Sequence, residues 1–123
     1  MSVTIHLEDD ALVMTFKSPW TWDEYQQIEA DIERLFHLAA EDVDLIIDLR
    51  DAGNMPESVL ARLRDAYADG TDNLRQYIFV GAQPSFVEAF KTADRYYTAL
   101  GGRLKYTFVD SMDEARLTAM LAL

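Results

Sequence analysis

Val43-Asp44-Leu45-Ile46-Ile47-Asp48-Leu49 stands near the middle of the 123-residue chain and has an almost unbroken apolar core. A short apolar run of this kind predicts a strand that is covered on both faces, as at the centre of a parallel sheet. It is followed by Arg50-Asp51-Ala52-Gly53-Asn54-Met55 and then by Pro56, a residue favoured at the first position of a helix. The pattern predicts a central parallel strand, a loop, and a helix over residues 56–70.

The rest of the chain alternates strands and helices in the same way. Further strands are predicted at residues 3–7, 12–16, 77–80 and 104–109, and further helices at 22–38, 85–100 and 111–121. Thr21 with Glu24, and Ser111 with Glu114, have the spacing of helix-capping pairs. This order predicts an α/β fold with a mixed sheet of about five strands and about four helices. The first strand is expected to be an antiparallel edge, and the rest parallel.

The length and the apolar pattern predict one domain, residues 1–123, around a single core. Ile46, Ile78 and Phe108 are expected in that core, because they lie in the apolar runs of predicted strands. Trp22 begins the apolar stripe of the first helix and is expected to pack inward. Trp20 lies beside Pro19 in a loop and is expected to be harder to bury.

The formal net charge of −11 is confined to the first half of the chain. Residues 1–61 contain 14 acidic and 3 basic residues, whereas residues 62–123 contain 8 of each. Without a cluster of Lys and Arg to meet phosphates, binding to nucleic acid is not expected. The acidity either serves solubility or forms a surface that meets a basic protein partner.

Composition also excludes other classes of protein. The longest apolar runs are far shorter than the roughly 20 residues that a membrane-spanning helix needs, so no membrane association is expected. The first residues lack the basic start and apolar block of a signal peptide. The chain has no cysteine, which excludes disulfides and thiolate chemistry. Together these features predict a cytoplasmic protein.

Catalytic and ligand-binding motifs are missing from the sequence. There is no glycine-rich dinucleotide fingerprint, no phosphate-binding loop with Gly-Lys-Ser or Gly-Lys-Thr, and no Gly-x-Ser-x-Gly elbow. His6 and His37 stand apart from other metal-binding residues. The acidic groups Glu8-Asp9-Asp10 and Glu41-Asp42-x-Asp44 have a turn-like, solvated setting. The sequence therefore predicts no enzyme, no cofactor and no metal site.

Specific residues resemble those of STAS domains, the fold of bacterial anti-sigma-factor antagonists. In that family a hydrophobic third strand ends in Asp-Leu and leads through a short loop to a helix that begins with Asp-Ser-Ser-Gly. Here the strand ends in Asp48-Leu49, and the helix is predicted to begin with Pro56-Glu57-Ser58-Val59. The chain thus departs from the motif at Pro56, Glu57 and Val59. The last strand and capped helix, residues 106–115, are also similar to the family's ending.

The resemblance implies a non-catalytic regulatory protein-interaction module. Its partner would be a regulatory protein such as an anti-sigma factor or a related kinase. Ser58 aligns with the serine that such kinases phosphorylate, although a serine in the first turn of a helix is also commonplace. The implied partner-binding residues are Asp51, Gly53, Asn54, Met55, Glu57 and Ser58. The oligomeric state is not predicted.

Two other functions stay open at this point. One is a small-ligand or lipid carrier of a STAS or Sec14-like type, in which Trp20, Trp22 and Tyr96 lie near a pocket. The other is a small enzyme. A closed apolar cavity would favour the carrier, whereas an exposed rim around Met55 and Ser58 would favour docking.

Overall fold

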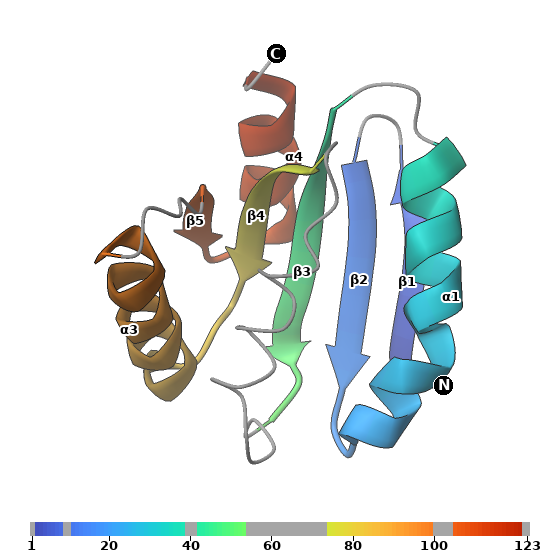
Figure 1. The fold of residues 1–123 in the computed structure, drawn as a ribbon, viewed down its shortest axis with the longest axis horizontal. Helices are drawn as coiled ribbons and strands as arrows, with labels where there is room; N and C mark the ends of the chain where they lie inside the picture. The colour runs from blue at the N-terminus through green and yellow to red at the C-terminus, as the bar shows by residue number, and fades with distance from the viewer. Residues whose placement is uncertain (1, 9–10, 39–41, 54–73, 100–104, 122–123) are drawn as a thin grey trace.

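Five strands form one mixed sheet, which organises the fold (Figure 1). The computed structural model describes residues 2–8, 11–38, 42–53, 74–99 and 105–121. The strands, in their order across the sheet, are β1 (Val3–Glu8), β2 (Ala11–Lys17), β3 (Val43–Asp51), β4 (Leu74–Val80) and β5 (Tyr106–Val109). β1 is antiparallel to β2, and the other neighbouring strands are parallel. The predicted sheet with an antiparallel edge strand is confirmed.

Helices cover both faces of this sheet. α1 (Trp22–Leu38) and α3 (Pro84–Ala99) pack on one face, here called the front face, and α4 (Met112–Leu121) packs on the back face (Figure 1). The helix predicted at 56–70 lies outside the described residues, so the described ranges contain three helices rather than the expected four. None of the described helices is both long enough and apolar enough to span a bilayer.

Both predicted helix caps are present. The backbone N–H of Glu24 donates to Thr21 Oγ1 at 3.3 Å, and the N–H of Glu114 donates to Ser111 Oγ at 3.1 Å. Each bond satisfies a donor that has no partner within the first turn of its helix. These local bonds explain why α1 and α4 begin where the sequence predicts.

β3 contributes to both layers of the core because successive side chains of a strand point to opposite faces. Val43, Leu45 and Leu49 belong to the front cluster of buried residues, and Ile46 belongs to the back cluster. Ile46 is 1% exposed and Ile78 is fully buried, as predicted. The apolar run at residues 45–47 therefore has the two-sided cover that its composition indicates.

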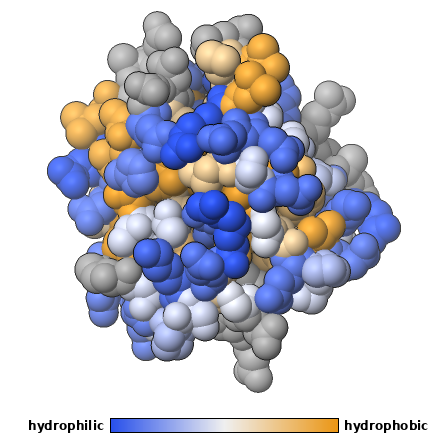
Figure 2. Space-filling model, turned by 180° about the vertical axis from the view of Figure 1, so that it is seen from behind, coloured by the Kyte–Doolittle hydropathy of each residue, from blue (hydrophilic) through white to orange (hydrophobic). Residues whose placement is uncertain are grey.

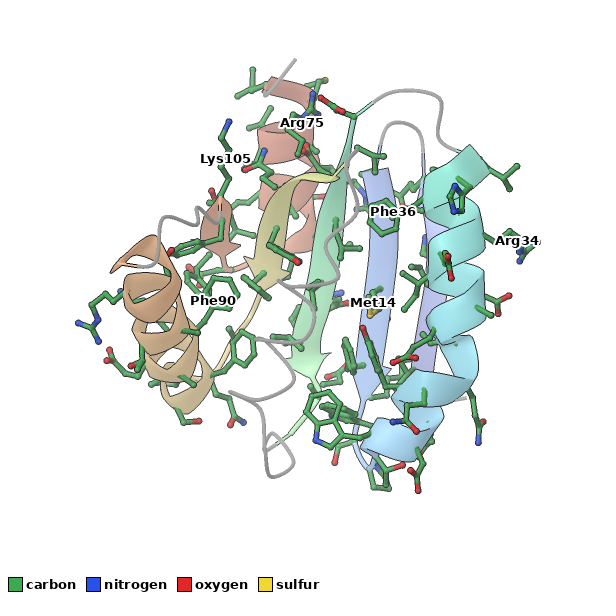
Figure 3. All side chains as sticks on the ribbon, viewed as in Figure 1. Met14, Arg34, Phe36, Arg75, Phe90 and Lys105 are labelled. Carbon is green, nitrogen blue, oxygen red and sulfur yellow. The ribbon has the colours of Figure 1, made fainter. Side chains whose placement is uncertain are left out.

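The front cluster is filled by large side chains from the helices. Met14 of β2 and Phe36 of α1 point into the layer between the sheet and α1, and Phe90 points from α3 toward the sheet (Figure 3). The ring centroid of Phe90 lies 4.7 Å from that of Phe79 in β4. Phe108, which was expected in the core, packs against the front cluster, but it is only half-buried because it lies on β5, an edge strand.

A buried ion pair joins β3 to β4 near the start of both strands. Arg75 Nε donates to Asp44 Oδ1 at 2.8 Å, and Arg75 Nη2 donates to Asp44 Oδ2 at 3.0 Å (Figure 3). Val43 pairs with Leu74 and Asp44 pairs with Gln76, so Arg75 lies at an irregularity of the ladder. Asp44 is fully buried, which corrects its expected solvated setting. A bulge of this kind re-aims a side chain, here toward the carboxylate.

Ile46→Ala tests the central position of β3. Truncation of a fully buried isoleucine removes apolar contacts and leaves a cavity, so we expect a loss of roughly 2 to 5 kcal/mol in the free energy of unfolding. Urea titration followed by circular dichroism measures this loss. Leu38→Ala at an exposed position of α1 is the control, with an expected change within about 0.5 kcal/mol. Equal effects of the two substitutions would contradict the burial of Ile46.

Candidate functional site

The predicted partner-binding segment starts at the edge of the sheet where the parallel strands end. β2 and β3 end next to each other, with Lys17 paired with Asp51. Asp51 is exposed and Gly53 is half-buried at this edge. The other predicted partner-binding residues lie outside the described residues: Asn54, Met55, Glu57 and Ser58. The structure thus places the start of the segment but not its continuation.

Hydrogen bonds from the loop after β2 hold the chain where it leaves β3. The Ser18 N–H donates to the Asp51 carbonyl at 2.7 Å. The Trp20 indole Nε1–H donates to the Ala52 carbonyl at 3.0 Å, and the Ala52 N–H donates to the Leu49 carbonyl at 3.2 Å. Ala52 itself is 2% exposed. The backbone at residues 51–52 is therefore fixed by partners that are distant in sequence.

Gly53 is needed for two separate reasons. Its φ of 67° lies in the left-handed region, where residues with a Cβ are strained. A Cβ at this position would also lie 2.9 Å from Ser18 Oγ. The positive φ agrees with a loop that leaves β3 here, as the sequence predicts. The closeness of the Ser18 loop is the feature that the sequence does not reveal.

Trp20 is buried, which corrects the expectation that its place beside Pro19 would expose it. It is 6% exposed, and its ring centroid lies 4.6 Å from that of Phe16 and 5.0 Å from that of Trp22. The Ala52 carbonyl satisfies the indole N–H, so the ring can enter the core without an unpaired polar atom. Trp22, expected to pack inward, is half-buried against the front cluster.

These positions also bear on the carrier hypothesis. Trp20 is part of the packed core rather than the lining of an open pocket, and its polar atom is already bonded. The side chain of Tyr96 lies outside the described part of the structure. The aromatic residues that motivated a carrier therefore give it no additional support.

A charged pair lies on the back face beside this edge. Arg50 Nε donates to Asp48 Oδ1 and Arg50 Nη2 donates to Asp48 Oδ2, both at 2.9 Å. The Arg50 backbone N–H also donates to Asp48 Oδ1, at 3.1 Å. The pKa of Asp48 is lower than its ordinary value, mainly because the Arg50 side chain donates hydrogen bonds to the carboxylate. Lys17 lowers this pKa further through a smaller Coulomb attraction. This pair was not predicted, because Arg50 was expected to follow the strand, whereas β3 extends to Asp51. The period-2 spacing of Asp48 and Arg50 is the sequence signal that could have indicated it.

Gly81 allows Arg50 to lie close to the end of β4. A Cβ at Gly81 would lie 2.6 Å from Arg50 Cγ, and its φ of 65° is again left-handed. The Gly81 N–H donates to the Val109 carbonyl at 2.9 Å. The ends of β3, β4 and β5 are thus joined closely along the same edge.

The chemistry available at this edge is that of a shaped, charged surface. The strand order follows the chain order, so these five strands have no reversal point of the kind at which open α/β sheets bind ligands. Among the described residues, no group of three or more His, Asp or Glu side chains could hold a metal ion. His6 and His37 are exposed and each contacts a glutamate, Glu8 at 3.2 Å and Glu33 at 3.8 Å.

Comparison with known proteins identifies no relative: no protein-family model matches the chain, and no curated protein matches it significantly. The similarity to STAS domains therefore rests on the residues quoted above and on the order of the elements.

Trp20→Phe tests how the edge is held. Phenylalanine keeps most of the buried ring but removes the indole N–H, which leaves the buried Ala52 carbonyl without this donor. We expect a loss of about 1 to 3 kcal/mol in the free energy of unfolding, measured by urea titration. Hydrogen exchange at the Ala52 amide should also become faster. Unchanged stability together with unchanged exchange would show that the indole bond does not hold residues 51–52.

The Asp48–Arg50 pair should make stability depend on pH. Because the pKa of Asp48 is lower in the folded protein than in the unfolded chain, folding favours the carboxylate. Its contribution is complete above about pH 4 and is lost as the pH falls through the folded-state pKa. Asp48→Asn should cost roughly 1 kcal/mol at pH 7, since Arg50 is half-exposed. Urea titrations at several pH values should show that this difference narrows below about pH 4, and a constant difference would refute the assignment.

Proposed function

We propose that this chain is a non-catalytic regulatory module of the STAS type that docks on a regulatory protein partner. The partner-contacting segment is residues 51–58, and an anti-sigma factor or related kinase is the partner class that the resemblance implies. The α/β fold with an antiparallel first strand agrees with the expectation from the sequence. We place the protein in the cytoplasm, in keeping with a chain that has no cysteine.

The observation that carries this proposal is the fixed backbone at residues 51–52. The Ser18 N–H and the Trp20 indole donate to the two carbonyls, which supports a fixed entry of the chain into the docking segment. A surface that is ordered before binding loses less conformational entropy when a partner docks. The exposed carboxylate of Asp51 stands on this fixed base and can meet a basic side chain.

Ser58 is the proposed phosphoacceptor within this segment. Its place in the first turn of a predicted helix would favour an added phosphate, because amides at a helix start attract anions. Asp51 and Glu57 already make the segment acidic. Phosphorylation would therefore add charge to an existing acidic surface and act on the partner rather than on the fold.

Asp51→Lys tests the docking surface. Reversal of this charge should weaken capture of a basic partner by about tenfold, or about 1.4 kcal/mol, while the melting temperature stays close to that of the wild type. Glu29→Lys is the matched control, with the same change in net charge at an exposed position of α1. The three immobilised proteins are incubated with native cytosol, and the captured proteins are quantified by mass spectrometry.

The proposal requires one regulatory protein that wild type and Glu29→Lys retain and Asp51→Lys loses. Phosphate on Ser58 after ATP is added would identify that protein as a kinase. Equal retention of the same partner by all three proteins would show that docking occurs elsewhere.

A further inference from the structure

α4 packs on the sheet through small residues. Ala115 is fully buried and Ala119 is 7% exposed, and both belong to the back cluster with Ile46 and Ile78. Small side chains let the helix axis lie close to the sheet. The inner face of α4 therefore needs no large apolar residue to complete the core.

The large apolar residues of α4 face solvent instead. Leu117, Met120 and Leu121 are 50%, 60% and 72% exposed. Their spacing of three and four residues places them on one side of the helix, away from Ala115 and Ala119. We call these three residues the outer stripe. The surface seen from the α4 side is largely hydrophilic, with hydrophobic residues in separate patches (Figure 2). A helix that packs on one sheet usually has its large apolar residues inside, so the outer stripe is unexplained by the fold.

Acidic residues extend the same side of α4. Asp113 and Glu114 lie one turn before Leu117 at helical spacing, and the Asp113 side chain is 99% exposed. Arg116, on the flank of the helix, forms an ion pair with Glu8 of β1 and a longer one, at 3.7 Å, with Asp113. The exposed side of α4 thus combines a negative first turn with an apolar second half.

A second copy of this chain does not complement that pattern. Arg116 is the one basic residue of α4, and Glu8 already binds it. In a parallel pair of α4 helices, acidic residues would face acidic residues. In an antiparallel pair aligned on the outer stripe, Asp113 and Glu114 would meet no basic residue of the other α4. The net charge of −11 adds a general repulsion between copies.

We propose that the outer stripe, together with Asp113 and Glu114, is the docking site for an amphipathic helix of a basic protein. The bound helix presents apolar residues over two turns to Leu117, Met120 and Leu121. One turn further along the same face of the bound helix, lysine or arginine residues contact the carboxylates of Asp113 and Glu114. This mode of recognition is that of a helix packed lengthwise on an apolar strip. The site is separate from residues 51–58 and stands whether or not that segment binds a partner.

A synthetic probe tests this directly with the full chain. The probe is a capped peptide of about 16 residues, long enough to form a helix, with leucines at i, i+3 and i+4 and lysines one turn further on the same face. A second peptide has glutamate in place of lysine. Calorimetry measures affinity, and amide chemical shifts locate the contact. We expect the lysine peptide to bind on α4 and the glutamate peptide to bind at least about tenfold more weakly.

Substitutions in the chain separate the outer stripe from general attraction between opposite charges. Leu117→Gln and Met120→Gln should each weaken binding of the lysine peptide by about tenfold, and Glu114→Lys by about two- to fivefold. The side chains of Leu117 and Met120 are exposed, so unchanged thermal melting is expected for these two variants. Glu114→Lys also places a positive charge in the first turn of α4, which should slightly lower the melting temperature of that variant. The controls are Leu38→Gln, at an apolar position that is 66% exposed on α1, and Glu29→Lys, and neither should weaken binding.

Two results would overturn the proposal. One is binding away from the outer stripe, seen as equal loss of affinity in the controls or as shift changes outside α4. The other is a concentration-dependent dimer of the wild type that Leu117→Gln abolishes in sedimentation experiments. In that case a second copy, rather than a basic helix, covers the outer stripe.

Discussion

Burial of β3 on both faces is the constraint on which the rest of the structure depends. Leu45 and Leu49 must be covered by the front layer and Ile46 by the back layer, so the sheet needs helices on both sides. β3 also pairs with β2 and β4, which leaves β1 and β5 as the edges. Its start is fixed to β4 by the Asp44–Arg75 pair, and its end is fixed to the loop after β2. The same strand therefore sets the register, the layers and the position of the candidate docking segment.

Information in local sequence accounts for the parts of the fold that were predicted. The spacing of apolar residues and the helix caps can be read within a short stretch of sequence. α1 accordingly has the bounds that Thr21 and the apolar stripe indicate. Contacts between distant segments were not predicted, because no local pattern encodes them. Asp44 looks like part of a solvated acidic turn until the ladder irregularity brings Arg75, 31 residues away, into contact with it. Phe108 has the composition of a core residue, but only the strand order shows that it lies on an edge.

The candidate site shows the same division between local and distant information. The loop after β3 is predicted, because a glycine after a parallel strand suits a change of direction, and the positive φ of Gly53 agrees. The role of Trp20 is missed, since neighbouring residues do not reveal that its indole N–H has a partner 32 positions later. This difference matters for function. A flexible loop after β3 would lose more conformational entropy when a partner docks. The bond from the Trp20 indole to the Ala52 carbonyl is the contact that fixes residues 51–52.

The two proposed surfaces lie on different parts of one rigid framework. Asp51 is at the carboxyl edge of the sheet, whereas α4 starts near that edge and runs along the back face to its opposite end, where Leu121 lies (Figure 1). Between them lies the back cluster, in which Ile46 of β3 and the two alanines of α4 are buried together as part of the core. Coupling between distant sites requires an element with two discrete arrangements, and we do not expect one in a cluster packed in this way. A phosphate on Ser58 would then regulate through direct contact with the partner at residues 51–58, and a protein bound to α4 would remain in place while that contact changes. Such an arrangement suits a module that joins two proteins and has only one of its two contacts switched.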